Sequence, residues 1–163
     1  MVTAERIEKT TLKNLLHNED YTRKVLPFLK SEYFDDRHER IVFTEIRKFV
    51  DQYNKRPTKE TLQIDLGKRK DLNEDEFKKI VDLISTLNKE DIDLDWLVNT
   101  TEKFCKDRAI HNAVMNGIHI LDGKDNKQTP EAIPEILRDA LSVSFDNAVG
   151  HDYLLDIDKR FDY

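Results

Sequence analysis

The sequence predicts an all-α fold, and its composition carries that prediction. Charged residues make up 37% of the 163-residue chain, whereas glycine and proline number only four each. Many charges combined with few helix breakers favour helices whose outer faces are solvated. An all-β domain would need more turn glycines and more alternation of β-branched residues than this chain contains. Leucine, isoleucine, valine and phenylalanine are frequent enough for a packed core.

Simple counts exclude several other classes of protein. The chain has no run of about 18 apolar residues, so no segment is expected to span a membrane. Its first residues lack the apolar stretch of a secretory signal. The single cysteine, Cys105, excludes an internal disulfide and a cysteine-based zinc site. The net charge of −6 should repel duplex DNA on average, although one local basic patch could still bind it. We therefore expect an acidic, intracellular protein.

Residues 1–92 are predicted to form a compact helical head of about five short helices. The first is expected at residues 3–17. The second contains Tyr21, Val25 and Leu29, and Pro27 should make its last turn irregular because proline cannot donate a backbone hydrogen bond. The third, residues 36–53, has the clearest apolar stripe in the head.

Local capping signals predict the fourth and fifth helices. Pro57 and Thr58 are expected to end the third helix and cap the fourth, which Gly67 would terminate. The sequence from Asn73 to Glu76 matches a capping box, and apolar residues at helical spacing follow it.

A long helix and a helical hairpin are predicted after the head. The acidic run Glu90 to Asp95 suits the start of a helix over residues 93–121, because negative charge complements the positive end of the helix dipole. A polar turn at residues 123–128 and a helix over residues 132–145 would complete an antiparallel hairpin. We therefore predict an arm over residues 93–146 and the start of a linker at residues 147–163.

No constellation of residues indicates catalysis or metal binding. The nearest match to a phosphate-binding loop, from Gly117 to Asp125, has one residue too many and follows a helix instead of a strand. His111 and His119 lie two helical turns apart, which is too far for joint chelation of a metal. Cys105 is expected to be a small core residue. The basic clusters at Lys55-Arg56 and at residues 68–70 lack the interleaved aromatic residues of a nucleic-acid site. We expect no catalytic, cofactor-binding or metal-binding residue.

The predicted arm has more apolar side chains than two helices can cover. Ile110, Val114, Ile118 and Leu121 form one stripe on the long helix, which is expected to face only the returning helix that contains Ile133 and Leu137. Either the arm folds back on the head or another chain covers the stripe. These six residues are the predicted candidates for an oligomer or partner interface.

Several short sequences occur in the order found in one known family. The chain resembles the N-terminal domain of the replicative helicases of T-even-type bacteriophages, which are DnaB-type hexameric helicases that work with a primase. The resemblance covers essentially the whole chain and rests on residues 31–34, 96–98, 101–103, 108–109 and 132–136 with Arg138, and above all on residues 140–146 followed by 149–152.

The resemblance implies a role in assembly and not in catalysis. In DnaB-type helicases such domains pair and form a collar above the motor ring, and primase docks on the collar. The family's ATP-hydrolysing domain, which uses ATP and magnesium, would follow residue 163 and is absent from this chain, so no catalytic residue can be transferred. We expect self-association into dimers and a hexameric collar, contact with primase, no membrane contact and little or no direct DNA binding, in the cytoplasm of the infected bacterium.

An alternative function stays open at this point. A free-standing helical adaptor or helicase-loading protein that binds single-stranded DNA or a replication protein would have a similar composition and helix pattern.

Overall fold

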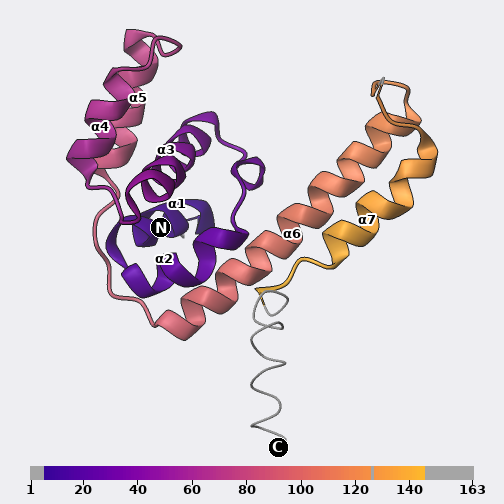
Figure 1. The fold of residues 1–163 in the computed structure, drawn as a ribbon, viewed down its shortest axis with the longest axis horizontal. Helices are drawn as coiled ribbons and strands as arrows, with labels where there is room; N and C mark the ends of the chain where they lie inside the picture. Colours follow the sequence, from indigo (N-terminus) through magenta and orange to yellow (C-terminus); the bar gives the residue numbers. More distant parts are fainter. Residues whose placement is uncertain (1–5, 126, 146–163) are drawn as a thin grey trace, which may run out of the picture. The chain divides into compact units, whose positions relative to one another are not determined.

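The computed structural model describes residues 6–125 and 127–145. Within these ranges the chain forms seven α-helices and three short 3₁₀ helices and no strand, which confirms the all-α prediction (Figure 1). No helix in the described ranges is both long and apolar enough to cross a bilayer. The predicted linker at residues 147–163 lies outside the described residues.

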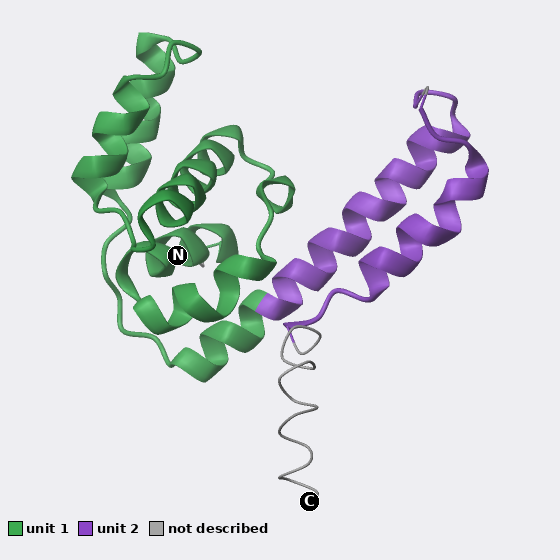
Figure 2. Ribbon diagram, in the orientation of Figure 1, with its two compact units in different colours: residues 1–101 green, residues 102–163 purple. Residues whose placement is uncertain are grey.

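The chain divides into two compact units, residues 1–101 and 102–163 (Figure 2). The division falls inside the long helix α6, Leu94–Leu121. The sequence pattern predicted that the arm begins at residue 93. In the structure, the first two turns of the long helix belong to the first unit instead. Leu97 and Thr101 on these turns are fully buried.

The first unit contains five α-helices before α6: α1 (Ile7–His17), α2 (Glu19–Val25), α3 (Arg37–Tyr53), α4 (Lys59–Gly67) and α5 (Glu74–Ser85). The 3₁₀ helices η1 (Leu26–Phe28) and η2 (Ser31–Tyr33) connect α2 to α3, and η1 is the irregular turn expected around Pro27. Helix α3 packs against α1, α4 and α5. Side chains from these helices and from the loops between them fill one core, in which Leu12, Tyr21, Ile46 and Ile80 are fully buried.

A buried hydrogen bond attaches the start of α6 to this core. The hydroxyl groups of Tyr21 and Thr101 lie 2.7 Å apart, and the Thr101 hydroxyl also donates to the carbonyl of Leu97 at 2.8 Å. Because both hydroxyl groups have a partner, their burial carries no unmet hydrogen-bonding cost.

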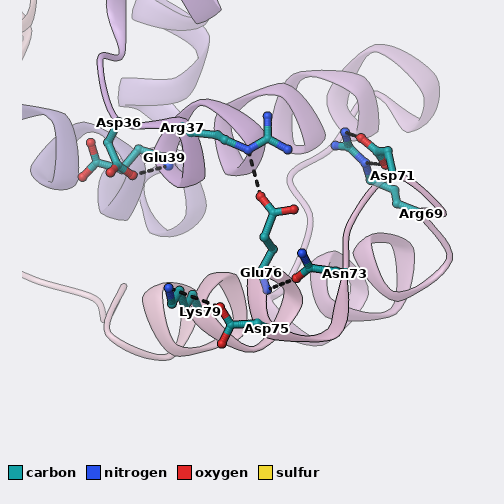
Figure 3. A network of polar contacts seen from close by, with 9 residues as sticks. All are labelled: Asp36, Arg37, Glu39, Arg69, Asp71, Asn73, Asp75, Glu76 and Lys79. Carbon is teal, nitrogen blue, oxygen red and sulfur yellow. Dashed lines mark hydrogen bonds and ion pairs between the residues drawn. The ribbon is translucent and has the colours of Figure 1, made fainter.

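The capping residues predicted from the sequence begin their helices as expected, with one difference. Thr58 and Thr61 form a reciprocal capping box at the start of α4. At α5 the Asn73 side chain accepts a hydrogen bond from the Glu76 backbone N–H at 2.7 Å, but the Glu76 carboxylate does not return the bond. It accepts instead from Nε of Arg37 on α3 at 2.9 Å (Figure 3). Only one of the two hydrogen bonds of the predicted capping box is therefore formed, because the Glu76 carboxylate binds an arginine on a neighbouring helix instead.

Gly67 ends α4 in a different way from the one predicted. It is the last residue of the helix and does not adopt the left-handed conformation of a glycine stop. A methyl group added there would lie 3.6 Å from the Phe77 ring, in ordinary contact. Gly67 therefore lies in a close contact between α4 and α5, which the sequence pattern did not reveal.

The second unit is the helical hairpin of α6 and α7 (Ile133–Leu141), with the short 3₁₀ helix η3 (Pro130–Ala132) before α7. Helix α6 ends in a Schellman motif, in which the N–H groups of Gly123 and Lys124 donate to the carbonyls of Ile120 and His119 at 3.1 and 2.9 Å. Gly123 adopts a φ of 75°, which glycine tolerates without strain. The predicted helix over residues 132–145 is shorter than expected, since α7 ends at Leu141.

Candidate interface of the helical hairpin

Small and apolar residues hold the two helices of the hairpin together. Ala113, Gly117 and Ile120 on α6 are buried at the spacing i, i+4, i+7. A Cβ at Gly117 would lie 3.6 Å from Cγ2 of Ile133, in ordinary van der Waals contact, so Gly117 faces α7. On α7, Ala140 is buried and Ile133 is half-buried. These residues form the contact line between α6 and α7.

The predicted stripe on α6 lies beside this contact line and not on it. Ile110, Val114, Ile118 and Leu121 are exposed by 38%, 46%, 44% and 68%. At about 100° per residue, their mean direction on the helix is about 90° from that of Ala113, Gly117 and Ile120. The prediction that the stripe faces the returning helix was therefore wrong, because the buried side of α6 lies about 90° around the helix from the stripe.

Helix α7 adds to the same side of the hairpin. Leu141, the last residue of α7, is 70% exposed. Around the α7 axis, Leu141 is rotated by about 90° from the residues that face α6. In an antiparallel pair of helices, this rotation places it on the same side of the hairpin as Ile110 and Val114. Leu137 is half-buried between that side and the contact line. We call the surface formed by Ile110, Val114, Ile118, Leu121 and Leu141 the apolar face.

At the end of the hairpin opposite its turn, one carboxylate on α6 binds the residues that follow α7. The sequence analysis did not single out this carboxylate. Oε2 of Glu102 on α6 accepts hydrogen bonds from the backbone N–H of Phe145 at 3.0 Å and from the Ser144 hydroxyl at 3.2 Å. Lys106 lies 3.6 Å from the same oxygen. Phe145 is buried. A glutamate on a helix surface carries no sequence signal for such a contact, because its partners are 42 and 43 residues away.

The structure shows where the residues considered for catalysis, phosphate binding or metal binding lie. Cys105 is fully buried, and burial raises the pKa of its thiol to about 12, as expected of a core residue. Gly117 lies inside α6 and Gly123 in its terminal turn, so neither belongs to a phosphate-binding loop. His111 and His119 are both exposed on α6. In the part of the chain that the structure describes, no cluster of three or more histidine, cysteine, aspartate or glutamate side chains is arranged to hold a metal.

Comparison with known proteins agrees with the resemblance read from the sequence. No protein-family model matches the chain. The chain is 36% identical over 158 residues to the DnaB-like replicative helicase of Enterobacteria phage T4. The match covers 92% of this chain and 33% of that helicase, so the chain spans about a third of the length of this relative. The resemblance to the DnaB-type helicases of T-even-type phages is thereby confirmed. The chain is similar to about one third of the length of a phage replicative helicase.

Proposed function

We propose that this chain is a collar-forming, self-associating domain of a bacteriophage replicative helicase and is not itself an enzyme. The observation that carries the proposal is the apolar face, which is exposed on the hairpin of a chain related to a helicase. Large apolar patches on a protein surface mark sites that another molecule covers. A second copy of the hairpin fits a two-fold interface, in which the same residues meet from both chains.

The energetics favour a weak dimer. Completing the burial of a half-exposed aliphatic side chain contributes about half of the ~1.5–3 kcal/mol expected for full burial, so four such residues on each of two chains contribute about 6–12 kcal/mol. Association costs about 4–15 kcal/mol in lost translational and rotational freedom. Because the two ranges overlap, we expect a concentration-dependent dimer. In a full-length helicase, tethering to a motor ring would raise the effective concentration of the hairpins.

Substitution of Val114 by aspartate tests the pairing. Sedimentation velocity of the wild type over a wide concentration range should show a monomer–dimer equilibrium. Val114→Asp should leave only monomer, because the carboxylate would be buried without a partner in the interface. The helical circular-dichroism signal should be retained, since Val114 is exposed in the single chain.

Ile64→Asp is the matched control, because Ile64 is an exposed aliphatic residue on α4, outside the hairpin. It should leave the dimer unchanged. If Val114→Asp unfolds the chain, the stripe is covered by the chain itself. If the wild type stays monomeric at every concentration, the proposed pairing is wrong and an adaptor function is favoured.

Contact with primase is the second part of the proposal, and it rests on the helicase relationship. The collar would bring primase to the replication fork in the cytoplasm of the infected bacterium. Isothermal titration of the wild-type chain with its cognate primase should release heat with a saturable midpoint. A flat titration at concentrations where the chain is dimeric would contradict primase docking and leave the self-association proposal intact.

A further inference from the structure

The first unit contains a cavity that self-association of the hairpin does not involve. It has a volume of about 570 Å³ and lies between α2, η1 and the C-terminal end of α3. Leu26, Pro27 and Val50 provide its apolar wall. The volume falls within the range of ordinary ligand-binding sites.

Charged side chains surround this apolar wall, and cations outnumber anions. Four cationic residues and two acidic residues line the cavity: Arg23, Arg47, Lys55, Arg56, Glu19 and Asp51. The chain as a whole has a net charge of −6. The cavity is therefore a local positive region on a negative protein, and it should attract an anionic partner.

Two of the arginines are held in place by backbone carbonyls. Arg47 donates hydrogen bonds to the carbonyls of Leu26 and Leu29, and its guanidinium lies 5.5 Å from the Phe43 ring centroid. Arg56 donates to the carbonyl of Leu16 at 3.0 Å. Neutral carbonyls do not cancel the charge of Arg47, whereas the charge of Arg56 is partly balanced by Glu19 at 4.0 Å.

The other two cations can reach a bound partner. Arg23 is 74% exposed and lies 2.6 Å from Glu19, which is also 4.0 Å from Arg56. Lys55 is exposed and forms no ion pair with another residue that the structure describes. Glu19 balances part of the positive charge of Arg23 and Arg56, so a carboxylate of the partner would replace Glu19 at Arg23.

A second hollow extends the site along α3. It has a volume of about 500 Å³, shares Arg47 and Asp51 with the first cavity, and adds Lys48. The two hollows together suit an extended chain segment better than a single small molecule.

The lining favours a protein segment over a nucleic acid. No aromatic side chain of the described residues lines either hollow, whereas single-stranded nucleic acids are commonly bound by stacking on aromatic rings. A peptide that alternates acidic and apolar side chains matches both the cations and the apolar wall.

We infer that the cavity between α2 and α3 is a docking site for an acidic segment of another protein that also carries apolar side chains. The segment's carboxylates would bind Arg23 and Lys55, and its apolar side chains would contact Leu26, Pro27 and Val50. This site is separate from the apolar face, so its test does not depend on hairpin pairing.

Fluorescence anisotropy with defined probes tests this inference. The probes are a labelled peptide with a repeating Glu-Leu-Asp sequence, the uncharged Gln-Leu-Asn peptide and labelled oligo-dT. The acidic peptide should bind saturably at low salt, the uncharged peptide should not, and oligo-dT should bind more weakly than the acidic peptide. Backbone amide signals that shift on binding should come from α2 and from the C-terminal end of α3.

Charge-reversal variants locate the site. Arg23→Glu and Lys55→Glu should each weaken binding of the acidic peptide about tenfold, which corresponds to ~1.4 kcal/mol. Lys79→Glu is the matched control, because Lys79 belongs to an exposed i,i+4 pair with Asp75 on α5, as Arg23 does with Glu19 on α2. It makes the same change in net charge outside the cavity and should leave the affinity within a factor of about two.

Three results would overturn the inference. The first is no binding of the acidic peptide to the wild type, and the second is equal weakening by Arg23→Glu and Lys79→Glu, which would show general attraction only. The third is tighter binding of oligo-dT than of the acidic peptide, which would assign the surface to nucleic acid. Lys55 lies in a loop, so Lys55→Glu keeps the test valid if Arg23→Glu disturbs α2.

Discussion

Glu39 is a buried carboxylate with incomplete hydrogen bonding. It lies in the first turn of α3 and is 3% exposed. Its Oε2 accepts a hydrogen bond from Arg6, whereas Oε1 has no partner among the described residues. Burial raises the pKa of Glu39 above the ordinary glutamate value, and the pairing with Arg6 opposes this effect without cancelling it.

The raised pKa makes a prediction about stability and pH. The folded state binds the Glu39 proton more tightly than the unfolded chain does, so the stabilisation from Glu39 is fully present below the ordinary glutamate pKa. It should be lost as the pH rises through the higher folded-state pKa. Glu39→Gln removes this titration and should flatten that part of the profile of unfolding free energy against pH, measured by urea unfolding.

Glu74→Gln serves as the comparison for Glu39→Gln, because Glu74 is an exposed glutamate in the first turn of α5. It should leave the slope of the profile unchanged. Equal slopes for the wild type and Glu39→Gln would show that Glu39 does not titrate differently in the folded state.

The two glycines of the hairpin have opposite effects on the stability of helix α6. Gly117 lies inside α6, and a Cβ there would make only ordinary contact with Ile133 at 3.6 Å. Gly123 adopts a φ of 75°, where a Cβ is strained even though the space around it is open. The first glycine weakens a helix, and the second ends one.

Alanine substitutions should therefore change stability in opposite directions. Gly117→Ala should stabilise the fold by about 0.5–1 kcal/mol, because glycine in a helix interior is entropically unfavourable. Gly123→Ala should destabilise it by about 1–2 kcal/mol, the cost of a left-handed conformation for an L-residue. Thermal and urea unfolding of both variants measure the difference. A loss of stability in Gly117→Ala would contradict the expectation that the added methyl group is accommodated without a shift of the helices.

Local signals in the sequence predicted where α4 and α5 begin. Thr58 and Asn73 each accept a hydrogen bond from a backbone N–H three residues later, within the span of the local pattern. The sequence could not predict that Arg37 would capture Glu76 or that Leu141 would remain exposed. These outcomes depend on which helices pack together, and an apolar spacing does not specify its partner.

The candidate interface was predicted in part for the same reason. The stripe from Ile110 to Leu121 was recognised from spacing alone, but the buried side of α6 contains Ala113 and Gly117. Small residues allow close packing, whereas hydrophobic spacing draws attention to large ones. The cavity between α2 and α3 had no sequence signal, because its walls come from separate segments of the first unit.

For the whole chain we expect no nucleotide binding. The residues nearest to a phosphate-loop pattern, Gly117 to Asp125, lie in the last turns of α6 and its Schellman motif, where the N–H groups of Gly123 and Lys124 already donate to helix carbonyls. They cannot also surround a phosphate. Calorimetric titration with ATP and magnesium should give no binding heat, and a saturable signal with a micromolar midpoint would contradict this expectation.

The contact of Glu102 with Ser144 and Phe145 brings the end of the hairpin back to the residues where the hairpin begins. Its reach can therefore change without displacing those residues. Adding seven residues to each helix would preserve the pairing register and extend the tip by about 10 Å at 1.5 Å per residue. The hairpin thus has the properties of an adjustable spacer, whose length evolution or engineering can set by paired insertions while the base stays fixed.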